Sequence, residues 1–123
     1  MKILIVEDNE QDQKIVKRYL TKAGYEDLQF AGSGEDGVAW AAKNKPNVVV
    51  TDTNLPGIDG FEVCRSIRQL PGFTGKVIVV TGSIDAVDAG RARQMGADDY
   101  CVKTSDCSPL LAAIKNCLTG HPS

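Results

Sequence analysis

Five residues that could do chemistry share one position in the sequence, because each stands at the end of a short apolar run. If these runs are parallel strands of one sheet, their carboxyl ends meet at a single edge, where an open α/β sheet binds its ligands. Residues far apart in the chain would then face one another. The five are three carboxylates, a hydroxyl and an ammonium: Glu7, Asp8, Asp52, Thr81 and Lys103.

Three carboxylates at one edge repel one another unless a cation lies among them or one of them stays protonated. Ligands that are all oxygen suit a hard cation such as Mg²⁺ (or Mn²⁺), and the lack of Cys or His at this edge argues against zinc. A carboxylate beside such a metal can attack a phosphoryl group and form an aspartyl phosphate. We therefore predict that Asp52 is the nucleophile, that Lys103 neutralises a phosphoryl oxygen and that Thr81 hydrogen-bonds another.

Each of these residues also has an ordinary structural interpretation. Asp8 could cap the first helix, with Asp12 in its first turn, since helix N-termini favour both. Asp52 could simply close a strand and open a turn. Thr81 could be a plain strand end, and Lys103 a solvated lysine. Suitable groups at every matching strand end favour the chemical interpretation of the set as a whole.

The elements that must position these residues alternate between short apolar runs and segments of helical periodicity. The predicted strands are Lys2–Val6, Leu28–Ala31, Val48–Thr51, Lys76–Val80 and Tyr100–Val102. The predicted helical faces are Ile15, Val16, Tyr19, Leu20 and Ala23; Val38, Ala41 and Ala42; Val63, Cys64 and Ile67; Ile84, Val87, Ala92 and Met95; and Leu110, Leu111, Ile114 and Leu118.

Glycine, proline and capping residues indicate where these helices begin and end. Gly24 ends the first helix, and Ser33 and Asp59 are each typical of an N-cap, with an acid three residues further on. The fourth helix is weak, because Gly90 inside it costs about 1 kcal/mol relative to Ala. Pro109 falls in the first turn of the last helix, where its missing N–H costs little.

These elements make five βα units, which is typical of an α/β fold. The segments Leu4–Val6, Val48–Val50 and Val77–Val80 are apolar without interruption, as a sheet covered on both faces requires. Right-handed crossovers then place helices on both faces of the sheet. We predict a doubly wound (βα)5 three-layer sandwich with a five-stranded parallel sheet, in the order 2-1-3-4-5 known for this class of fold.

Composition limits the class of protein. The chain has 123 residues, 42% of them apolar, which fits one domain over residues 1–123 with no room for an output domain. The net charge of −2 and the lack of a basic run argue against direct binding of nucleic acid. No apolar run approaches the ~18 residues of a membrane span, and the start MKILIVEDNE is unlike a signal peptide, so we expect a cytoplasmic protein.

The cysteines and the single histidine do not have the spacing of a metal site. We expect reduced, packed thiols, because a chain without a secretion signal rarely builds a disulfide framework. His121 is expected to be a solvated residue of the tail. The four cysteines are Cys64, Cys101, Cys107 and Cys117.

Four motifs carry a resemblance to a known family: ILIVEDN at 3–9, VVVTDTNLPGIDG at 48–60, VIVVTGS at 77–83 and GADDYCVK at 96–103. With them the chain resembles the response-regulator receiver domain of two-component signalling, the CheY-like family, over nearly its whole length. The resemblance implies a phosphoacceptor switch and not an enzyme, with at most slow self-phosphorylation and autodephosphorylation.

The resemblance also implies a role for each matching residue. These are the phosphoryl acceptor Asp52; the metal ligands Glu7 (through water), Asp8, Asp52 and Asn54 (through its backbone carbonyl); the phosphoryl-binding or switch residues Thr81, Lys103 and Tyr100, the last being the aromatic whose rotamer follows Thr81; and the rate-tuning positions Asn54 and Ser83.

One position departs from the family's pattern. The family usually has a proline after the lysine, joined to it by a cis peptide bond, whereas Lys103 is followed here by Thr104. A non-proline cis bond costs about 2.5–4 kcal/mol, and nothing visible compensates that cost. We therefore predict a trans bond and a rerouted loop before the last helix.

The resemblance implies partners as well. A histidine kinase or a histidine phosphotransfer protein would supply the phosphoryl group from a phosphohistidine. A downstream protein would read the state of the switch on the face made by the fourth helix, the fifth strand and the fifth helix, and a homodimer is an alternative form of output. These implications describe a phosphorelay component with Mg²⁺ as its cofactor.

Three other functions compete with this interpretation. A hydrolase of the haloacid-dehalogenase kind would need a second acid two residues after its nucleophile, where this chain has Asn54. A flavodoxin-like FMN binder would need a phosphate loop after the first strand, where Glu7 and Asp8 repel phosphate. A degenerate receiver that acts only as a binding module is supported by Thr104 alone.

Overall fold

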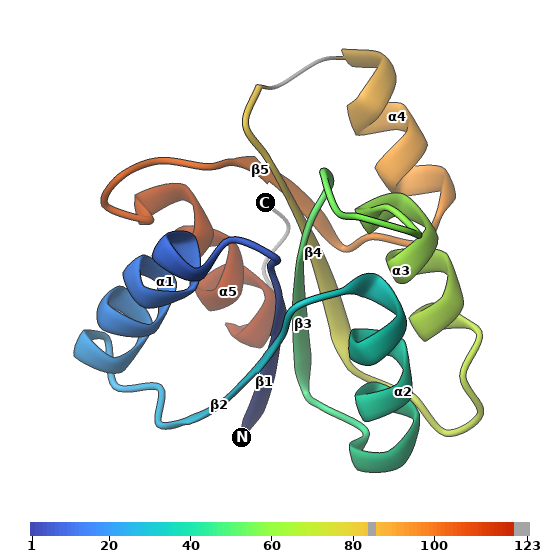
Figure 1. The fold of residues 1–123 in the computed structure, drawn as a ribbon, viewed down its shortest axis with the longest axis horizontal. Helices are drawn as coiled ribbons and strands as arrows, with labels where there is room; N and C mark the ends of the chain where they lie inside the picture. Colours follow the sequence, from blue (N-terminus) through green and yellow to red (C-terminus); the bar gives the residue numbers. More distant parts are fainter. Residues whose placement is uncertain (84–85, 120–123) are drawn as a thin grey trace.

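The computed structural model describes residues 1–83 and 86–119, and strands alternate with helices along the chain (Figure 1). The elements are β1 (Lys2–Val6), α1 (Glu10–Lys22), β2 (Asp27–Ala31), α2 (Gly34–Asn44), β3 (Val48–Asp52), α3 (Gly60–Arg68), β4 (Lys76–Thr81), α4 (Ala86–Gln94), β5 (Asp99–Val102) and α5 (Ser108–Thr119).

The five strands form one parallel sheet in the order β2-β1-β3-β4-β5. The register pairs Asp52 with Val80 and Thr81 with Val102, so the ends of β3, β4 and β5 lie level with one another. The predicted fold class and strand order are therefore confirmed. A slip of one residue would turn the side chains of a strand toward the opposite face of the sheet, so the packing of both faces specifies the register.

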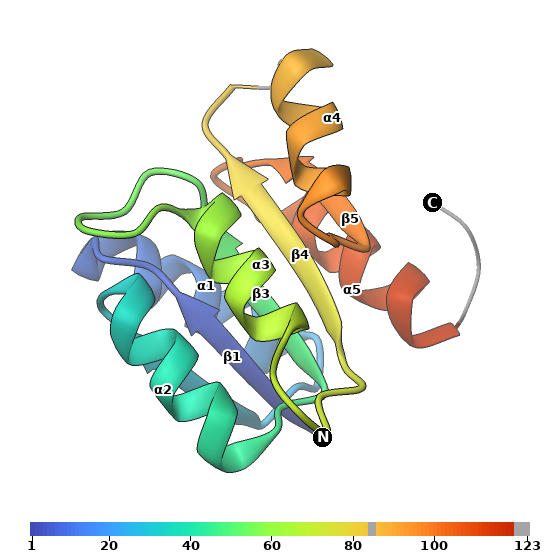
Figure 2. The same cartoon turned by 90° about the vertical axis from the view of Figure 1, so that its right-hand side faces the viewer.

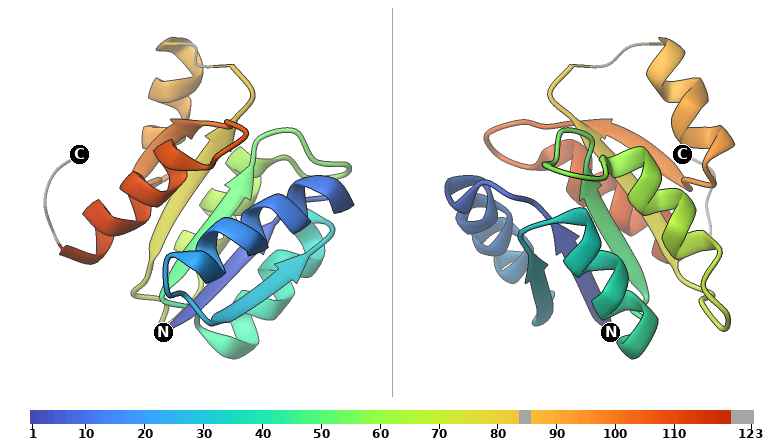
Figure 3. Two further views of the ribbon diagram at one scale, coloured as in Figure 1. Left: turned by 90° about the vertical axis from the view of Figure 1, so that its left-hand side faces the viewer. Right: turned by 45° about the vertical axis from the view of Figure 1, so that its right-hand side comes forward.

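Helices cover both faces of the sheet, as Figure 2 and the left view of Figure 3 show from opposite sides, and an apolar layer lies on each face. Alternate residues along each strand point to opposite faces, which is why uninterrupted apolar strands suit a sheet covered on both sides. On one face, side chains from α2, α3 and α4 pack against Leu4, Val6, Val49, Val77 and Val79. On the other, α1 and α5 pack against Ile3, Ile5, Val48, Val50, Ile78 and Val80.

Two of the predicted helix caps are confirmed, and a third helix is capped by a residue other than the expected one. The Ser33 hydroxyl accepts from the Asp36 N–H, and the Asp59 carboxylate accepts from the Glu62 N–H. At α1 the cap is Asn9, whose side-chain oxygen accepts from the backbone N–H of Asp12.

The capping interpretation of Asp8 is therefore wrong, because helix α1 begins one residue later than that interpretation requires. Both Asp8 and Asn9 are good caps by residue type. Because Asn9 caps helix α1, the side chain of Asp8 does not serve as its cap.

The predicted face of the fourth helix is only partly correct. Ala92 is buried and Met95 packs against the core, but Val87 is 78% exposed. Five residues of helix rotate a side chain by about 140°, so Val87 and Ala92 lie on different sides of α4. Ile84 of the same prediction lies outside the described residues.

Several other predicted positions are confirmed, but Ile15, Ala23 and Ala42, expected on the apolar faces of their helices, are exposed. Pro109 lies in the first turn of α5, and α1 ends before Gly24. Leu118, expected on the buried face of α5, is instead half-exposed in the last turn of that helix. No helix of the described residues is long and apolar enough to span a membrane.

All four cysteines are free thiols, as predicted, and three of them are buried. Burial raises the pKa of Cys64 to about 11 and the pKa of Cys101 to about 12, so both stay protonated and unreactive near neutral pH. His121 lies outside the described residues.

Candidate functional site

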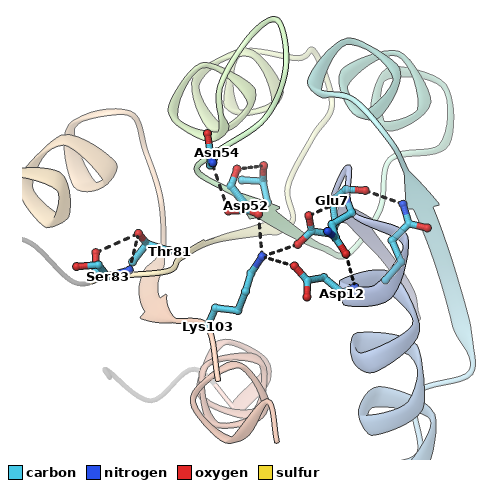
Figure 4. Close-up of polar contacts among 10 residues, drawn as sticks. Glu7, Asp12, Asp52, Asn54, Thr81, Ser83 and Lys103 are labelled. Atoms are coloured by element: carbon cyan, nitrogen blue, oxygen red, sulfur yellow. Dashed lines mark hydrogen bonds and ion pairs between the residues drawn. The ribbon is translucent and has the colours of Figure 1, made fainter. Parts of the chain in front are cut away.

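The predicted site residues lie at the carboxyl edge of the sheet, where β1, β3, β4 and β5 end (Figure 4). Glu7 and Asp52 are only 4% and 8% exposed, whereas Asp8 is exposed. One carboxylate oxygen from each of these three acids lies within 4.8 Å of the other two. The three carboxylates, predicted from the ends of β1 and β3, are therefore brought together.

A glycine allows the loop after β3 to fold back closely on Asp52. A Cβ atom at Gly60 would lie 2.0 Å from the carbonyl oxygen of Asp52, so no larger residue fits there without a shift of the backbone. The Gly60 N–H in turn donates to the carbonyl of Thr53. The N-terminus of α3 is thus fixed directly against the residue predicted to react.

Asn54 contacts Asp52 through its backbone and not through its side chain. Its backbone N–H donates to Oδ1 of Asp52 at 3.2 Å. This bond fixes the orientation of the carboxylate and leaves the Oδ2 atom facing the other site residues. The side chain of Asn54 is exposed.

The side chain of Lys103 forms ion pairs with three carboxylates of the site. Its Nζ atom donates to Glu7 Oε1 at 2.7 Å, to Asp52 Oδ2 at 2.9 Å and to Asp12 Oδ2 at 3.0 Å. The interpretation of Lys103 as a merely solvated lysine is therefore wrong, although its side chain is still 32% exposed. The strand ends position this ammonium within reach of the residue predicted to accept the phosphoryl group.

Burial and hydrogen bonding shift the pKa values of Glu7 and Lys103 in the site. Burial raises the pKa of Glu7 from 4.5 to about 7, against the lowering effect of its hydrogen bond with Lys103. Burial lowers the pKa of the Lys103 ammonium, but its hydrogen bonds to Glu7, Asp52 and Asp12 raise that pKa more, so it lies above its usual value. The site is thus a dense acidic pocket with one fixed cation.

Thr81 lies at the same edge but does not contact the acids. Its hydroxyl donates to the carbonyl of Ser83 at 3.1 Å and accepts from the Ser83 N–H at 3.3 Å (Figure 4). Tyr100 packs against the layer formed with α2, α3 and α4, and its buried hydroxyl has no hydrogen-bond partner among the described residues. A buried hydroxyl without a hydrogen-bond partner is energetically unfavourable. A second position of the Tyr100 ring that gives the hydroxyl a partner would therefore be favoured.

Two contacts of the site were not predicted as functional. Asp12 was considered only as a residue of the first helical turn, yet it reaches Lys103. The side-chain amide of Gln13 donates to the carbonyl of Glu7 at 2.6 Å. The available signal was topological: the N-terminus of a helix that follows β1 lies at the same edge as the end of β5.

The peptide bond between Lys103 and Thr104 is trans, as predicted, since no bond of the described residues is cis. Hydrogen bonds of Asp106, and not a cis proline, hold the loop between β5 and α5. The carboxylate of Asp106 accepts from the Thr104 hydroxyl at 2.9 Å and from the Ser108 N–H at 3.0 Å, which caps the start of α5. These hydrogen bonds lower the pKa of Asp106. Cys107 adopts a positive φ of 58° in this loop.

Comparison with known proteins agrees with this geometry. The sequence profile of the family described as "Response regulator receiver domain" matches residues 3–115. The chain is 39% identical over 116 residues to the transcriptional regulatory protein AfsQ1 of Streptomyces coelicolor, and these cover 92% of the chain and 49% of that protein. It is 36% identical over 121 residues to the response regulator ArlR of Staphylococcus saprophyticus, covering 98% of the chain and 54% of that protein.

Solved structures show the same fold. The chemotaxis protein CheY4 of Vibrio cholerae matches with a TM-score of 0.86 and 26% identity, over 94% of this chain and 97% of that one. A CheY-like response regulator receiver domain protein of Methanospirillum hungatei matches with a TM-score of 0.84 and 30% identity, over 97% of this chain and 94% of that one.

An acidic pocket at the carboxyl edge of a β2-β1-β3-β4-β5 sheet, with a lysine fixed across it, defines a CheY-like domain of two-component signalling. The chain belongs to the response regulator receiver domain family. It spans about half the length of the curated relatives it matches. Receiver domains bind Mg²⁺ in an acidic pocket, and Glu7, Asp8 and Asp52 are an acidic group that could hold such an ion.

Proposed function

We propose that this chain is a phosphoacceptor switch in which Asp52 receives a phosphoryl group from a phosphohistidine of a histidine kinase or a histidine phosphotransfer protein. The observation that carries the proposal is the position of Asp52: it is buried, 2.9 Å from the Lys103 ammonium, and adjacent to two further acids. A structural aspartate that merely closes a strand would need neither partner.

In the proposed reaction an oxygen of the Asp52 carboxylate forms a bond to phosphorus. The P–N bond of the phosphohistidine breaks, and the imidazole leaves with the electron pair and takes up a proton. Lys103 offsets the negative charge of the transferred group, because an ammonium in a partly buried site is a strong electrostatic partner. The Asn54 N–H holds the carboxylate in one orientation during the attack.

The acids of the site suit a hard divalent cation, since all their donor atoms are oxygen. In the proposal, Asp8 and Asp52 hold Mg²⁺ (or Mn²⁺) directly, Glu7 holds it through water, and Asn54 contributes its backbone carbonyl. When bound, the ion supplies charge neutralisation for the phosphoryl oxygens. Without a metal ion, Lys103 offsets the charge of Glu7 and Asp52 directly, and Asp8 is not among the carboxylates that it contacts.

The proposed switch uses the two residues that do not contact the acids. Thr81 exchanges its hydrogen bonds with Ser83 for one to the phosphoryl group, and Tyr100 moves with it. The new charge-assisted contacts bias a two-state element. A downstream partner, or a second copy of the chain, then reads the face formed by α4, β5 and α5. Asn54 and Ser83 are the positions proposed to tune hydrolysis.

The test is covalent labelling with a small donor. Purified protein is incubated with Mg²⁺ and ³²P-labelled acetyl phosphate, and we expect label that hydroxylamine releases, as an acyl phosphate requires. Asp52→Asn removes the label, and a metal chelator prevents its formation. Asp27→Asn, an exposed aspartate on β2, is the control and keeps the label.

The result also separates the proposal from its alternatives. Label that persists unchanged in Asp52→Asn would refute the assignment of the acceptor. Steady hydrolysis of small phosphate esters would favour the hydrolase, although Asn54 occupies the place of its second acid. A wild-type protein that takes no label from any donor, yet binds a signalling partner, would be a degenerate receiver.

A further inference from the structure

The ammonium of Lys103 has three hydrogens, and three carboxylates accept them. Two of these acceptors, Glu7 and Asp52, come from the ends of β1 and β3. The third, Asp12, comes from the first turn of α1, with its Oδ2 atom 3.0 Å from Nζ (Figure 4). Asp12 is thus the one acceptor that lies outside the group proposed to hold the metal.

The remainder of the Lys103 side chain is not fixed by close packing. It lines a cavity of about 330 Å³ between α1 and the loop 103–107, together with Ile15, Val16, Cys107 and Leu110. The loop beyond it has a trans bond to Thr104 in place of a rigid proline. The position of the ammonium therefore depends on its ion partners more than on its surroundings.

Asp12 is well placed to be the permanent partner. Its backbone N–H is bound by the cap Asn9, so the start of α1 holds the residue at the edge of the site. Its side chain is 34% exposed and makes no other hydrogen bond to a described residue. An exposed acid in a first helical turn could serve the helix dipole alone, but that role needs no contact with Lys103.

We propose that Asp12 is a positioning residue for phosphoryl transfer, which holds the Lys103 ammonium beside Asp52 so that it meets the incoming phosphoryl group. The inference rests on the proposed function of Asp52. On phosphorylation the ammonium keeps its bonds to Glu7 and Asp12 and transfers the third from the Asp52 carboxylate to a phosphoryl oxygen. Only hydrogen bonds are exchanged in this step, and no proton is transferred.

The chain offers a matched control for this proposal. Asp36 occupies the same place in α2 that Asp12 has in α1: it lies in the first turn, and its N–H donates to the cap Ser33. Asp36 is exposed and is not among the three carboxylates that Lys103 binds. Asp12→Ala and Asp36→Ala therefore remove the same helix-dipole interaction, but only the first removes the ion pair.

The first measurement is the initial rate of labelling by acetyl phosphate over a range of donor and Mg²⁺ concentrations. We expect Asp12→Ala to lower the rate about tenfold, since a charge-assisted bond that positions a reacting group has this order of effect. Asp36→Ala keeps the wild-type rate. Asp12→Asn, which retains an oxygen acceptor of the same size, restores part of the loss. A rate for Asp12→Ala equal to or above that of Asp36→Ala would overturn the proposal, as would an Asp12→Asn variant no faster than Asp12→Ala.

A second measurement does not depend on phosphorylation. The ¹⁵N–¹H signal of the Lys103 ammonium is visible by NMR when hydrogen bonds protect it from exchange with water. We expect this signal in the wild-type protein and in Asp36→Ala, and its loss in Asp12→Ala. A wild-type protein that takes no label refutes the proposed function, while persistence of the signal in Asp12→Ala refutes the positioning role by itself.

Discussion

At the scale of single residues, Lys103 balances a site that would otherwise repel itself. Glu7, Asp12 and Asp52 all accept from it, and no other cation contacts these acids in the described part of the chain. A bound divalent cation would compete with this ammonium for the same carboxylates. Under the proposed function, the lysine would weaken the binding of the metal while it supplies a positive charge for the phosphoryl group.

We expect Lys103→Met to bind Mg²⁺ roughly tenfold more tightly than the wild-type protein, because a unit charge a few ångströms away in a partly solvated site contributes about 1–4 kcal/mol. The same variant is labelled at Asp52 more slowly. Isothermal titration calorimetry measures the affinity. Lys76→Met, which removes a lysine 4.0 Å from Asp98, serves as the control and leaves both properties unchanged. Equal Mg²⁺ affinities of Lys103→Met and wild type would contradict this account of the site.

Residue types and strand ends sufficed to predict the gathering of Glu7, Asp8, Asp52 and Lys103, because the carboxyl ends of parallel strands share one edge. The contact of Asp12 could not be predicted in the same way. It depends on the direction of a helix N-terminus and on the length of one lysine side chain. The unpartnered Tyr100 hydroxyl depends on packing across two elements, which the sequence does not display.

At the scale of elements, the site depends on how closely α3 begins beside β3. Asp59 caps this helix, and Gly60 presses against the Asp52 carbonyl. The same Asp59 carboxylate pairs with Arg91 of α4 at 3.5 Å, and the Arg91 guanidinium lies 4.4 Å from the centre of the Phe61 ring. The loop after Asp52, the proposed acceptor, is thereby connected to α4 through α3.

Gly60→Ala tests the close approach. We expect a loss of about 1–3 kcal/mol in the free energy of unfolding, since the added Cβ has to displace backbone and not a flexible side chain. The displacement also weakens Mg²⁺ binding and slows labelling of Asp52. Urea denaturation and calorimetry measure the two effects.

The control for this variant is Gly32→Ala, where a Cβ would meet nothing within 4 Å. We expect Gly32→Ala to remain within about 0.5 kcal/mol of wild type. If Gly60→Ala were equally harmless, the backbone of α3 would not be a fixed support of the site.

The sequence sufficed for the existence and type of every element, because three strands contain uninterrupted apolar runs, strands and helices alternate along the chain, and two helices have unambiguous caps. The predictions from sequence were wrong where two structural alternatives are nearly equal in energy. Asp8 and Asn9 are both good caps, and the structure uses Asn9. In α4 few apolar residues define a face, so Val87 was assigned to the wrong side.

At the scale of the whole molecule, the two edges of the sheet have separate tasks. The carboxyl edge holds the charged pocket, while the amino edge is fastened by Arg68 at the end of α3. The Arg68 guanidinium donates to the carbonyls of Gly75 and Gly96 and to the carboxylate of Asp98. Asp98 also accepts from the N–H of Val77, so one ion pair joins α3, β4 and the segment before β5.

Arg68→Met tests this separation of tasks. We expect it to lower the free energy of unfolding by about 2–3 kcal/mol, because two carbonyls lose their side-chain donor and Asp98 keeps only the Val77 N–H and the more distant Lys76 as partners among the described residues. The rate of Asp52 labelling per folded molecule stays unchanged, since the reaction takes place at the other edge. Arg65→Met, which removes only an exposed contact of 3.9 Å with Glu62, costs about 0.5 kcal/mol or less. Slower labelling of folded Arg68→Met would show that the two edges are coupled.

Helix α4 has few buried side chains, and this affects which of its residues can change during evolution. Among its described side chains only Ala92 is buried, and the ion pair of Arg91 with Asp59 supplies a further fastening. Exchanges at exposed positions of this helix such as Arg93 and Gln94 are therefore expected to leave the apolar layer beneath it intact. Descendants of one ancestral chain could alter this surface step by step, and so acquire new recognition properties, while the chemistry at the far end of β3 is inherited intact.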